Sequence, residues 1–296
     1  MSTAPPIVAT RQPRARRPLA AVTALRRRPM AVASIVLTLV AWQVVSMAAG
    51  ENRNGDATVP SLFDALGAFK SLAFYWKGGL GVPSVADGGD PTWEAAVMSF
   101  LYNTGISAVR MAGGMVLGVA VGIGLAIVVS WSSLLRRMFA LPSHFARMMP
   151  LLAMVPLFSL WFGDTMQGAI LFIAFTAFVL VYPITVNAIG NVASHYEQYA
   201  RSLGASSARV YFTVVLPAAL PEVRSGIMLA VGLGWSATIA AEYLGQPSGL
   251  GSIAQNAQYF VRTDLLALVA LISLVLAAIS FFIVRRALAW ATRWSE

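Results

Sequence analysis

Cysteine is absent from this 296-residue chain, which excludes disulfides, thiol chemistry and metal sites built on thiolates. Histidine is nearly absent as well. His144 and His195 are the two present, and each lies beside a charged or polar turn. We therefore expect no metal site and no histidine acting as a general acid or base. We also predict no cofactor.

Charge is scarce. Charged residues make up 11% of the chain and hydrophobic residues 58%, with a mean hydropathy of +0.71. Soluble domains carry about a quarter charged residues, so this composition indicates an integral membrane protein. The net charge of +9 would suit a nucleic-acid partner, but the basic residues cluster beside apolar runs instead of on one face. We predict no nucleic-acid partner.

Patterns that carry catalysis are also missing. No Gly-x-x-x-x-Gly-Lys-Ser/Thr motif occurs, and Lys70 and Lys77 are the only lysines, so we expect no ATP hydrolysis by this chain. No catalytic constellation is visible, so we predict no catalytic residue and no enzyme. A secondary, ion-coupled transporter remains the alternative function, but it would need intramembrane charges and internal repeats, which we do not see.

Three ionisable residues lie close to the apolar runs: Arg110, Asp164 and Glu242. Each is expected near an outer end of a membrane span. We predict that these side chains serve as interfacial anchors.

Six apolar runs approach or exceed the length of about 20 residues that a helix needs to cross a membrane. We predict an all-α integral membrane protein with six transmembrane helices, at 30–50, 111–135, 148–163, 165–189, 225–241 and 265–284. The second helix has an alternative start near Asn103. Within it Gly114, Gly118 and Gly122 recur every fourth residue, which allows close contact between helices. Packing within the subunit is favoured for them, and a dimer contact stays open.

The remaining segments complete the expected organisation. Residues 1–29 hold seven arginines, five prolines and no acid, which predicts a disordered tail lying against an anionic inner leaflet. Residues 51–102 are expected outside the membrane. Residues 103–286 are expected to form a five-helix core, and 287–296 a second cytoplasmic tail.

The outer segment contains one predicted amphipathic helix. Ser61 is expected to cap it, with Asp64 near its positive end. Its apolar face is expected to consist of four side chains: Leu62, Leu66, Phe69 and Ala73. Tyr75 and Trp76 suit the headgroup level of a membrane, and the Gly- and Pro-rich stretch 78–91 is typical of a loop.

The distribution of basic residues sets the expected orientation. With six spans both termini lie on one side. If that side is cytoplasmic, all but five of the 21 lysines and arginines lie inside. The five exceptions are Arg53, Lys70, Lys77, Arg110 and Arg262. Because lysine and arginine are concentrated on the cytoplasmic side of membrane proteins, we predict cytoplasmic termini in a multi-pass protein of the cell membrane.

A polar, helix-competent interval lies between the fourth and fifth spans. Two short helices are predicted there, at 196–203 and 208–215, separated by Gly204, which permits the positive φ that ends a helix. Pro217 and Pro221 are expected to stop the second helix and to turn the chain into the next span.

The spacing inside this interval carries a resemblance. Gly204 is followed by nine residues, Val214, one spacer and Leu216-Pro217. This resembles the loop signature of permease subunits of binding-protein-dependent ABC importers: a Glu-Ala-Ala triplet, a glycine and a terminal Leu-Pro. Ala-Arg-Ser-Leu-Gly-Ala-Ser at 200–206 and Leu-Pro-Ala-Ala-Leu-Pro at 216–221 resemble the nitrate, sulfonate and taurine subfamily. The resemblance covers about 60–74 and 103–286.

The resemblance implies a type I ABC importer permease fold with cytoplasmic coupling helices in the loop 191–221. It also implies three partners: cytoplasmic ATPase subunits, an extracytoplasmic solute-binding protein and a second permease subunit, expected as a homodimer. The solute would be a sulfonate, taurine, nitrate or a similar small nutrient. The residues expected to contact the ATPase are Glu197, Gln198, Tyr199, Ala200, Arg201, Gly204, Leu216 and Pro217.

Two departures from the family pattern stand out. The Glu-Ala-Ala triplet falls on Gln198, Tyr199 and Ala200, with an acid one position earlier at Glu197, and the stretch 78–91 resembles an insertion.

For the translocation pathway we predict a lining from the proline-interrupted third span and the fifth span. The candidates are Pro156, Gly234, Trp235, Ser236 and Glu242; broken backbone and small residues permit a water-filled cavity.

Overall fold

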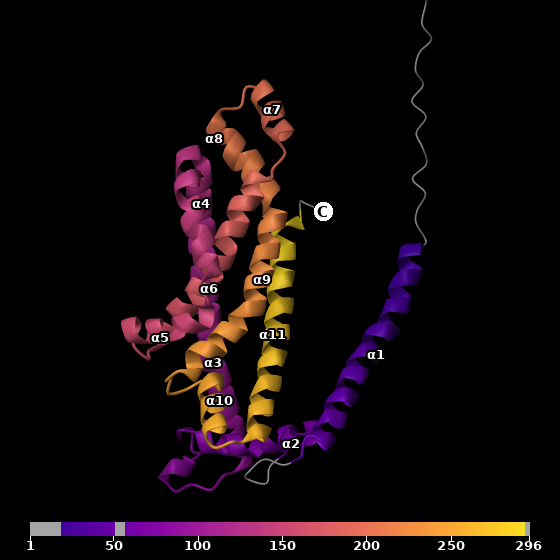
Figure 1. Cartoon of the computed structure of the whole chain (residues 1–296), viewed down its shortest axis with the longest axis vertical. Helices are drawn as coiled ribbons and strands as arrows, with labels where there is room; N and C mark the ends of the chain where they lie inside the picture. The colour runs from indigo at the N-terminus through magenta and orange to yellow at the C-terminus, as the bar shows by residue number, and fades with distance from the viewer. Residues whose placement is uncertain (1–18, 51–56, 294–296) are drawn as a thin grey trace, which may run out of the picture.

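A computed structural model describes residues 19–50 and 57–293 of the chain, and in this part every regular element is a helix (Figure 1). The α-helices are α1 (Leu19–Ala48), α2 (Leu62–Gly67), α3 (Trp93–Trp131), α4 (Ser133–Met148), α5 (Leu151–Phe162), α6 (Met166–Gly190), α7 (Ser194–Ser202), α8 (Ser207–Val210), α9 (Leu216–Tyr243), α10 (Leu250–Tyr259) and α11 (Thr263–Ala291). Two 3₁₀ helices, η1 (Ala68–Tyr75) and η2 (Val85–Asp87), and one π-helix, η3 (Tyr211–Val215), complete the set.

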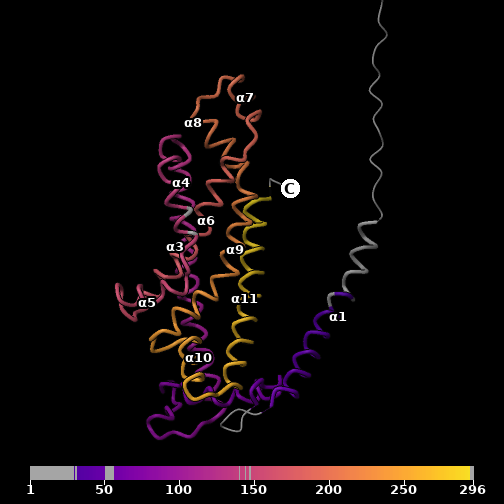
Figure 2. Tube along the Cα trace, in the orientation of Figure 1, coloured from indigo at the N-terminus to yellow at the C-terminus, as the bar shows by residue number. Residues whose placement is uncertain are grey.

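The long helices run side by side, so the bundle has two ends (Figure 1). One end carries α7 and α8 and is called the α7 end. The opposite end carries α2 and α10 and is called the α10 end. The backbone trace in Figure 2 shows α1 leaning away from the bundle on the side of α11. It is attached near the α10 end, where the Trp42 indole donates to the Pro60 carbonyl at 3.0 Å.

Helices α3, α6 and α9 form the centre of the bundle, and glycine allows α3 and α6 to approach closely. A β-carbon at Gly114 would collide with Ile173, and one at Gly118 would collide with the backbone oxygen of Ala174. Gly122 is buried on the same face. Without side chains at these positions the two helix backbones can pack tightly. The predicted glycine contact is confirmed as packing within the subunit.

Four helices in the described part of the chain are long and apolar enough to cross a membrane: 93–131, 166–190, 207–243 and 263–291. Two shorter apolar helices, Val32–Ala48 and Leu151–Phe162, correspond to the first and third predicted spans. The predicted all-α membrane fold is confirmed. The count of six spans depends on the two shorter helices.

Helix α3 starts well before the predicted span. Its N-cap is Thr92, whose side chain accepts from the Ala95 N–H at 3.1 Å, whereas the sequence favoured a start at 111 or near Asn103. The first turns bury a stripe of small residues spaced by four: Ala95, Ser99, Asn103 and Ser107. Serine and asparagine lower the average hydropathy, so a search for apolar runs misses these turns.

The helix after the polar interval does not stop at its prolines. Residues 207–243 form one continuous helix in which the π-turn η3 precedes α9, so the predicted break at Pro217 and Pro221 is wrong. Pro217 closely follows the π-turn, where the α-type ladder of hydrogen bonds is already interrupted, so its missing N–H costs little. The wider π-turn before it relaxes the ladder of backbone hydrogen bonds.

Helix α2 has the predicted cap but not the predicted face. The Asp64 N–H donates to the Ser61 side chain at 3.1 Å, and the Ser61 N–H donates to the Asp64 carboxylate at 3.0 Å. The four residues of the predicted apolar face differ in exposure: Leu66 is 62% exposed, while Ala73 is fully buried. The helix tightens to 3₁₀ geometry at η1, which changes the period from 3.6 to 3 residues, so the four do not share one face.

After η1, Trp76 packs inside the protein. It is buried, and its indole donates to the Val82 carbonyl at 3.0 Å.

Other boundaries shift as well. Helix α1 begins at Leu19, so only residues before it can belong to the predicted tail, and 1–18 lie outside the described residues, as do 51–56 and 294–296. The residues between the second and third predicted spans form the helix α4. It lies toward the α7 end and packs on α3 and α6, whereas α5 packs on α6 and α9 (Figure 1).

Candidate functional site

The polar interval forms a compact helical elbow at the α7 end. Helix α7 carries Glu197 to Arg201 in succession. Gln198, Tyr199 and Arg201 are exposed, with Tyr199 69% exposed, whereas Glu197 and Ala200 are half-buried. Helix α7 therefore presents a polar and aromatic face outward and keeps its smallest residue against the protein.

Gly204 ends α7 in the way that the sequence predicts. Its φ is +80°, in the left-handed region, and a β-carbon there would meet open space. The Gly204 N–H donates to the Arg201 carbonyl at 2.9 Å, and the Ala205 N–H donates to the Ala200 carbonyl at 3.1 Å. These two bonds form a Schellman motif, which favours glycine at this position. At Gly204 itself no side chain projects from the turn.

The second arm of the elbow is anchored in the bundle. Ser206 caps α8, and the Tyr211 hydroxyl donates to the Ile127 carbonyl of α3 at 2.7 Å. Val210 and Val215 are buried in a cluster with Ile189 of α6. The last two residues of the predicted signature, Leu216 and Pro217, are half-buried at the start of α9. The structure thus places the eight predicted coupling residues on one elbow, from α7 to the first turn of α9.

A cavity of about 800 Å³ lies between α5, α9, α10 and α11. Trp235 and Ser236, two of the five predicted pathway residues, line it, together with Gly232 and Tyr243 of the same helix. The Trp235 indole also donates to the Ser280 hydroxyl of α11 at 3.0 Å.

The other pathway candidates lie elsewhere. Pro156 is exposed on α5, one residue after Val155, which does line the cavity. A β-carbon at Gly234 would lie 3.2 Å from both Met111 and Met115. This glycine therefore serves the packing of α9 on α3. Glu242 is fully buried in a separate polar cluster.

That cluster is built on an ion pair between two spans. Arg110 Nη1 of α3 donates to Glu242 Oε1 of α9 at 2.9 Å, and the side chains are 3% and 0% exposed. Ser107 donates to the second carboxylate oxygen at 2.8 Å, and the Gly251 N–H donates to the same oxygen at 3.0 Å. The carboxylate therefore has partners on α3 and α10.

Arginine extends the cluster to the loop before α10. Arg110 Nη1 donates to the Ser248 carbonyl at 2.7 Å, and Nη2 donates to the Gln246 side chain at 2.9 Å. Asn103 of α3 accepts from the Gly249 N–H at 2.8 Å. The expectation that Arg110 and Glu242 are interfacial anchors is wrong, because each finds its partner inside the bundle. Asp164, the third candidate, is exposed and accepts from Ser159.

Sequence reasoning missed this polar cluster as a unit. The available signal was the spacing of Asn103, Ser107 and Arg110, which places them on one face of a helix ahead of an apolar run. An acid at the end of the fifth span, Glu242, was the matching charge. The view that no charges lie within the spans is therefore also wrong.

Comparison with known proteins agrees with this architecture. Residues 114–293 match the family described as the binding-protein-dependent transport system inner membrane component. The taurine transport system permease protein TauC of Escherichia coli is 39% identical over 133 residues, which is 44% of this chain and 47% of TauC, so the chain spans about half of that relative. The bicarbonate transport system permease protein CmpB of Synechococcus elongatus is 32% identical over 199 residues, 65% of this chain and 68% of CmpB.

A solved structure supports the fold. A chain of the methionine ABC transporter MetNI in an inward-facing conformation matches with a TM-score of 0.52 at 19% identity, covering 64% of this chain and 93% of its own length. The helical bundle thus has the fold seen in a chain of that ABC transporter. Because the family match covers more than half of the sequence, this chain belongs to the inner-membrane components, or permease subunits, of binding-protein-dependent ABC transport systems.

Proposed function

We propose that a pair of these chains forms the membrane pathway of an importer for a small oxyanion, with ATP hydrolysis supplied by separate cytoplasmic subunits and solute delivered by an extracytoplasmic binding protein. The observation that carries the proposal is the α7 elbow. Its sequence matches the family signature, and its first helix, α7, ends in a Schellman motif at Gly204. A homodimer is proposed because one chain would then supply both halves of the pathway.

The exposed side of the elbow supports its role as the ATPase contact. Tyr199 is 69% exposed and Leu203 is 88% exposed, and exposed aromatic and apolar side chains beside polar ones are typical of protein interfaces. The elbow is joined to the bundle through the continuous helix 207–243. A displacement of α7 by the ATPase would therefore move the residues of α9.

The 800 Å³ cavity is the proposed pathway. Its wall on α9 contains Trp235 and Ser236, and the same helix begins at the elbow, so coupling and transport share one element. Trp235 offers an indole ring and Ser236 a hydroxyl, which suits the passage of a small polar solute along a mostly apolar wall. In this proposal Pro156 and Gly234 act indirectly. Pro156 interrupts the backbone of α5, and Gly234 allows α9 to pack closely on α3.

The substrate class is proposed from the relatives. TauC is named for taurine, which is a sulfonate, and CmpB for bicarbonate; both solutes are small oxyanions. We propose a sulfonate such as taurine, or nitrate. Uptake of labelled taurine, competed by an alkanesulfonate, by nitrate and by bicarbonate, tests the class. Competition by none of the oxyanions in a system that still assembles would rule it out.

The coupling proposal is tested at Gly204. The substitution Gly204→Asp should abolish uptake and the co-purification of the ATPase subunit, because a side chain opposes the left-handed turn by about 1–2 kcal/mol and separates the two surfaces. Arg201→Ala should be milder, since an exposed polar contact is worth about 0–1 kcal/mol. The measurement is the ATPase retained by tagged permease, together with uptake in cells.

Gly204→Asn is the matched control, because asparagine has the shape of aspartate and a similar tolerance of the left-handed region but adds no charge. It should retain more ATPase than Gly204→Asp. All variants should insert normally, since no span is altered. Normal ATPase retention and normal uptake by Gly204→Asp would falsify the coupling role.

A further inference from the structure

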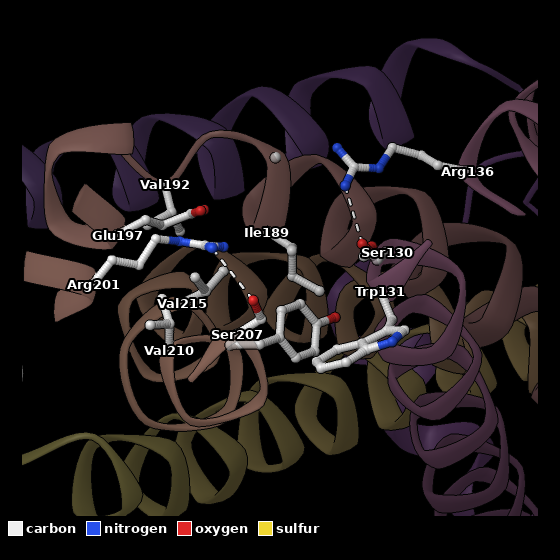
Figure 3. A pocket seen from close by; sticks show the side chains of 12 residues that line it. Ser130, Trp131, Arg136, Ile189, Val192, Glu197, Arg201, Ser207, Val210 and Val215 are labelled. Atoms are coloured by element: carbon white, nitrogen blue, oxygen red, sulfur yellow. Dashed lines mark hydrogen bonds between the residues drawn. The ribbon is translucent and has the colours of Figure 1, made fainter. Parts of the chain in front are cut away.

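A second cavity lies behind the elbow, at the α7 end of the bundle. It has a volume of about 260 Å³ and is bounded by the end of α3, the start of α4, the end of α6, and α7 with α8. Figure 3 shows Arg136 and Arg201 entering the region from different elements, with Trp131 beneath them. It is separate from the proposed pathway, since the two cavities have no lining residue in common.

The positive charge of this cavity comes from the two arginines. Arg136 Nη2 donates to the Ser130 carbonyl at 3.0 Å, and Arg201 Nη1 donates to the Ser207 hydroxyl at 3.3 Å. A guanidinium has five N–H donors, so each arginine retains donors for a further acceptor. The bonds to Ser130 and Ser207 orient both groups within the cavity wall (Figure 3).

An unpartnered hydroxyl provides an independent sign of a ligand. Ser130 lines the cavity and is 4% exposed, and its Oγ has no hydrogen-bond partner among the described residues. A buried hydroxyl without a partner costs roughly 1–3 kcal/mol. The Oγ atom is enclosed, so the side chain would have to rotate about its Cα–Cβ bond to donate to an acceptor in the cavity. The Ser207 hydroxyl adds a further polar group to the same wall.

One acid faces these groups. Glu197 of α7 also lines the cavity and is half-buried. Against two guanidinium groups it leaves a net charge of +1 on the lining. This balance favours a small anion over a cation. It also favours an oxyanion over chloride, because guanidinium and hydroxyl donors match several oxygens at once.

We propose that this cavity binds a tetrahedral oxyanion, a sulfate or phosphate group, between Arg136 at the start of α4 and Arg201 of α7, with Ser130 and Ser207 as further donors. Free sulfate or phosphate and the headgroup of an anionic phospholipid carry the same chemistry. The anion joins α7 to the junction of α3 and α4. If the elbow is the ATPase contact, as proposed above, an anion held here stiffens the surface that receives the ATPase.

The test uses the full-length permease without its ATPase, so its outcome does not depend on the coupling proposal. Protein in nanodiscs of phosphatidylcholine is titrated with sodium sulfate, and with sodium chloride at equal ionic strength, while the midpoint of thermal unfolding is followed. Sulfate should raise the midpoint in a saturable way. Arg201→Gln should weaken sulfate binding about tenfold, because one charge-assisted contact is lost, and Arg136→Gln should do the same.

Arg137→Gln and Arg209→Gln are matched controls. These arginines neighbour the cavity in sequence but do not line it, so both variants should bind like the wild type. Arg201 is exposed on a surface helix, so its variant should fold even if Arg136→Gln does not. Sulfate binding that is unchanged in Arg201→Gln, or stabilisation no greater than that by chloride in every lipid, would overturn the proposal.

A second arm separates the two sources of the anion. Nanodiscs containing one-fifth phosphatidylglycerol replace free sulfate. If the lipid raises the midpoint, and Arg201→Gln and Arg136→Gln remove that effect, the natural occupant is a headgroup, and sulfate should then compete with it. Stabilisation by the lipid that survives in both variants, without a specific effect of sulfate, would mean that the cavity is not the site.

Discussion

At the scale of single residues, the main finding is a buried ion pair in a chain with few charges. Arg110 and Glu242 are almost fully buried and lie on different spans. Moving a charge out of water costs several kcal/mol, which the pair recovers only with good geometry and further hydrogen bonds. Here Ser107, Gln246 and the Gly251 N–H supply those bonds. The cluster fixes the loop before α10 against α3.

Removing one partner of the pair should therefore be costly. Arg110→Met leaves the Glu242 carboxylate buried without its countercharge, and we expect a loss of about 3–5 kcal/mol of stability. Glu242→Gln should also be costly, because Arg110 keeps a buried charge without its partner and the amide nitrogen replaces an oxygen that accepts hydrogen bonds. The measurement is the thermal-unfolding midpoint of purified protein. The double variant Arg110→Met with Glu242→Leu should lose less than the sum of the single changes. Wild-type stability in Arg110→Met would refute this role.

Sequence reasoning succeeds at residues whose role is local and fails where partners are distant. Gly204 was identified from the pattern around it, because a helix-ending glycine depends only on its neighbours along the chain. Arg110 and Glu242 are separated by 132 positions, and no pattern within either segment states that they meet. The pathway residues divide in the same way. Ser236 and Gly234 are two positions apart on α9, yet Ser236 lines the cavity whereas Gly234 packs against α3.

At the scale of elements, hydropathy identified the spans but not their ends. Helix α6 begins within one residue of its predicted start, because its whole length is apolar. The predicted second span is shorter than helix α3, because the first turns of α3 bury small polar residues. The proline rule fails at Pro217, since the π-turn just before it already interrupts the α-type ladder of backbone hydrogen bonds. The positions of caps and π-turns depend on hydrogen bonds that composition does not encode.

The cavity beside α9 gives an element-scale prediction. Ser236→Phe should fill part of the proposed pathway and reduce uptake at least tenfold while leaving the ATPase attached, because Ser236 is exposed to the cavity and supports no packing contact that we describe. Ser225→Phe on the same helix is the control, since Ser225 is exposed and does not line the cavity. Uptake and ATPase co-purification are measured together. Equal uptake in the two variants would remove Ser236 from the pathway.

At the scale of the whole molecule, the elements form a bundle whose two ends differ in chemistry. The α7 end carries the elbow and arginines 136, 201 and 209, and the α10 end carries α2, η1 and η2, which contains Ala86. The bias of basic residues predicts that the α7 end is cytoplasmic. The sequence predicted this division because charge counts and span order are properties of the whole chain that need no contact information.

The orientation is tested with single cysteines in this cysteine-free chain. Leu203 is 88% exposed at the α7 end, and Ala86 is exposed at the α10 end. A membrane-impermeant thiol reagent on intact spheroplasts should label Ala86→Cys and should not label Leu203→Cys until the membrane is opened. The reverse pattern would invert the orientation and would place the proposed ATPase contact on the wrong side of the membrane.

The continuous helix 207–243 also has a mechanical consequence. At 1.5 Å per residue it is a rod about 55 Å long, with the elbow at one end and Glu242 clamped at the other. A tilt of about 5° about the clamped end would carry the elbow end through about 5 Å, on the same geometry, while Ser236, close to the pivot, would move by less than about 1 Å. The rod is thus a lever with unequal arms. If the ATPase tilts it as proposed, the rod would exchange a large, weak displacement at the surface for a small, strong one at the cavity wall.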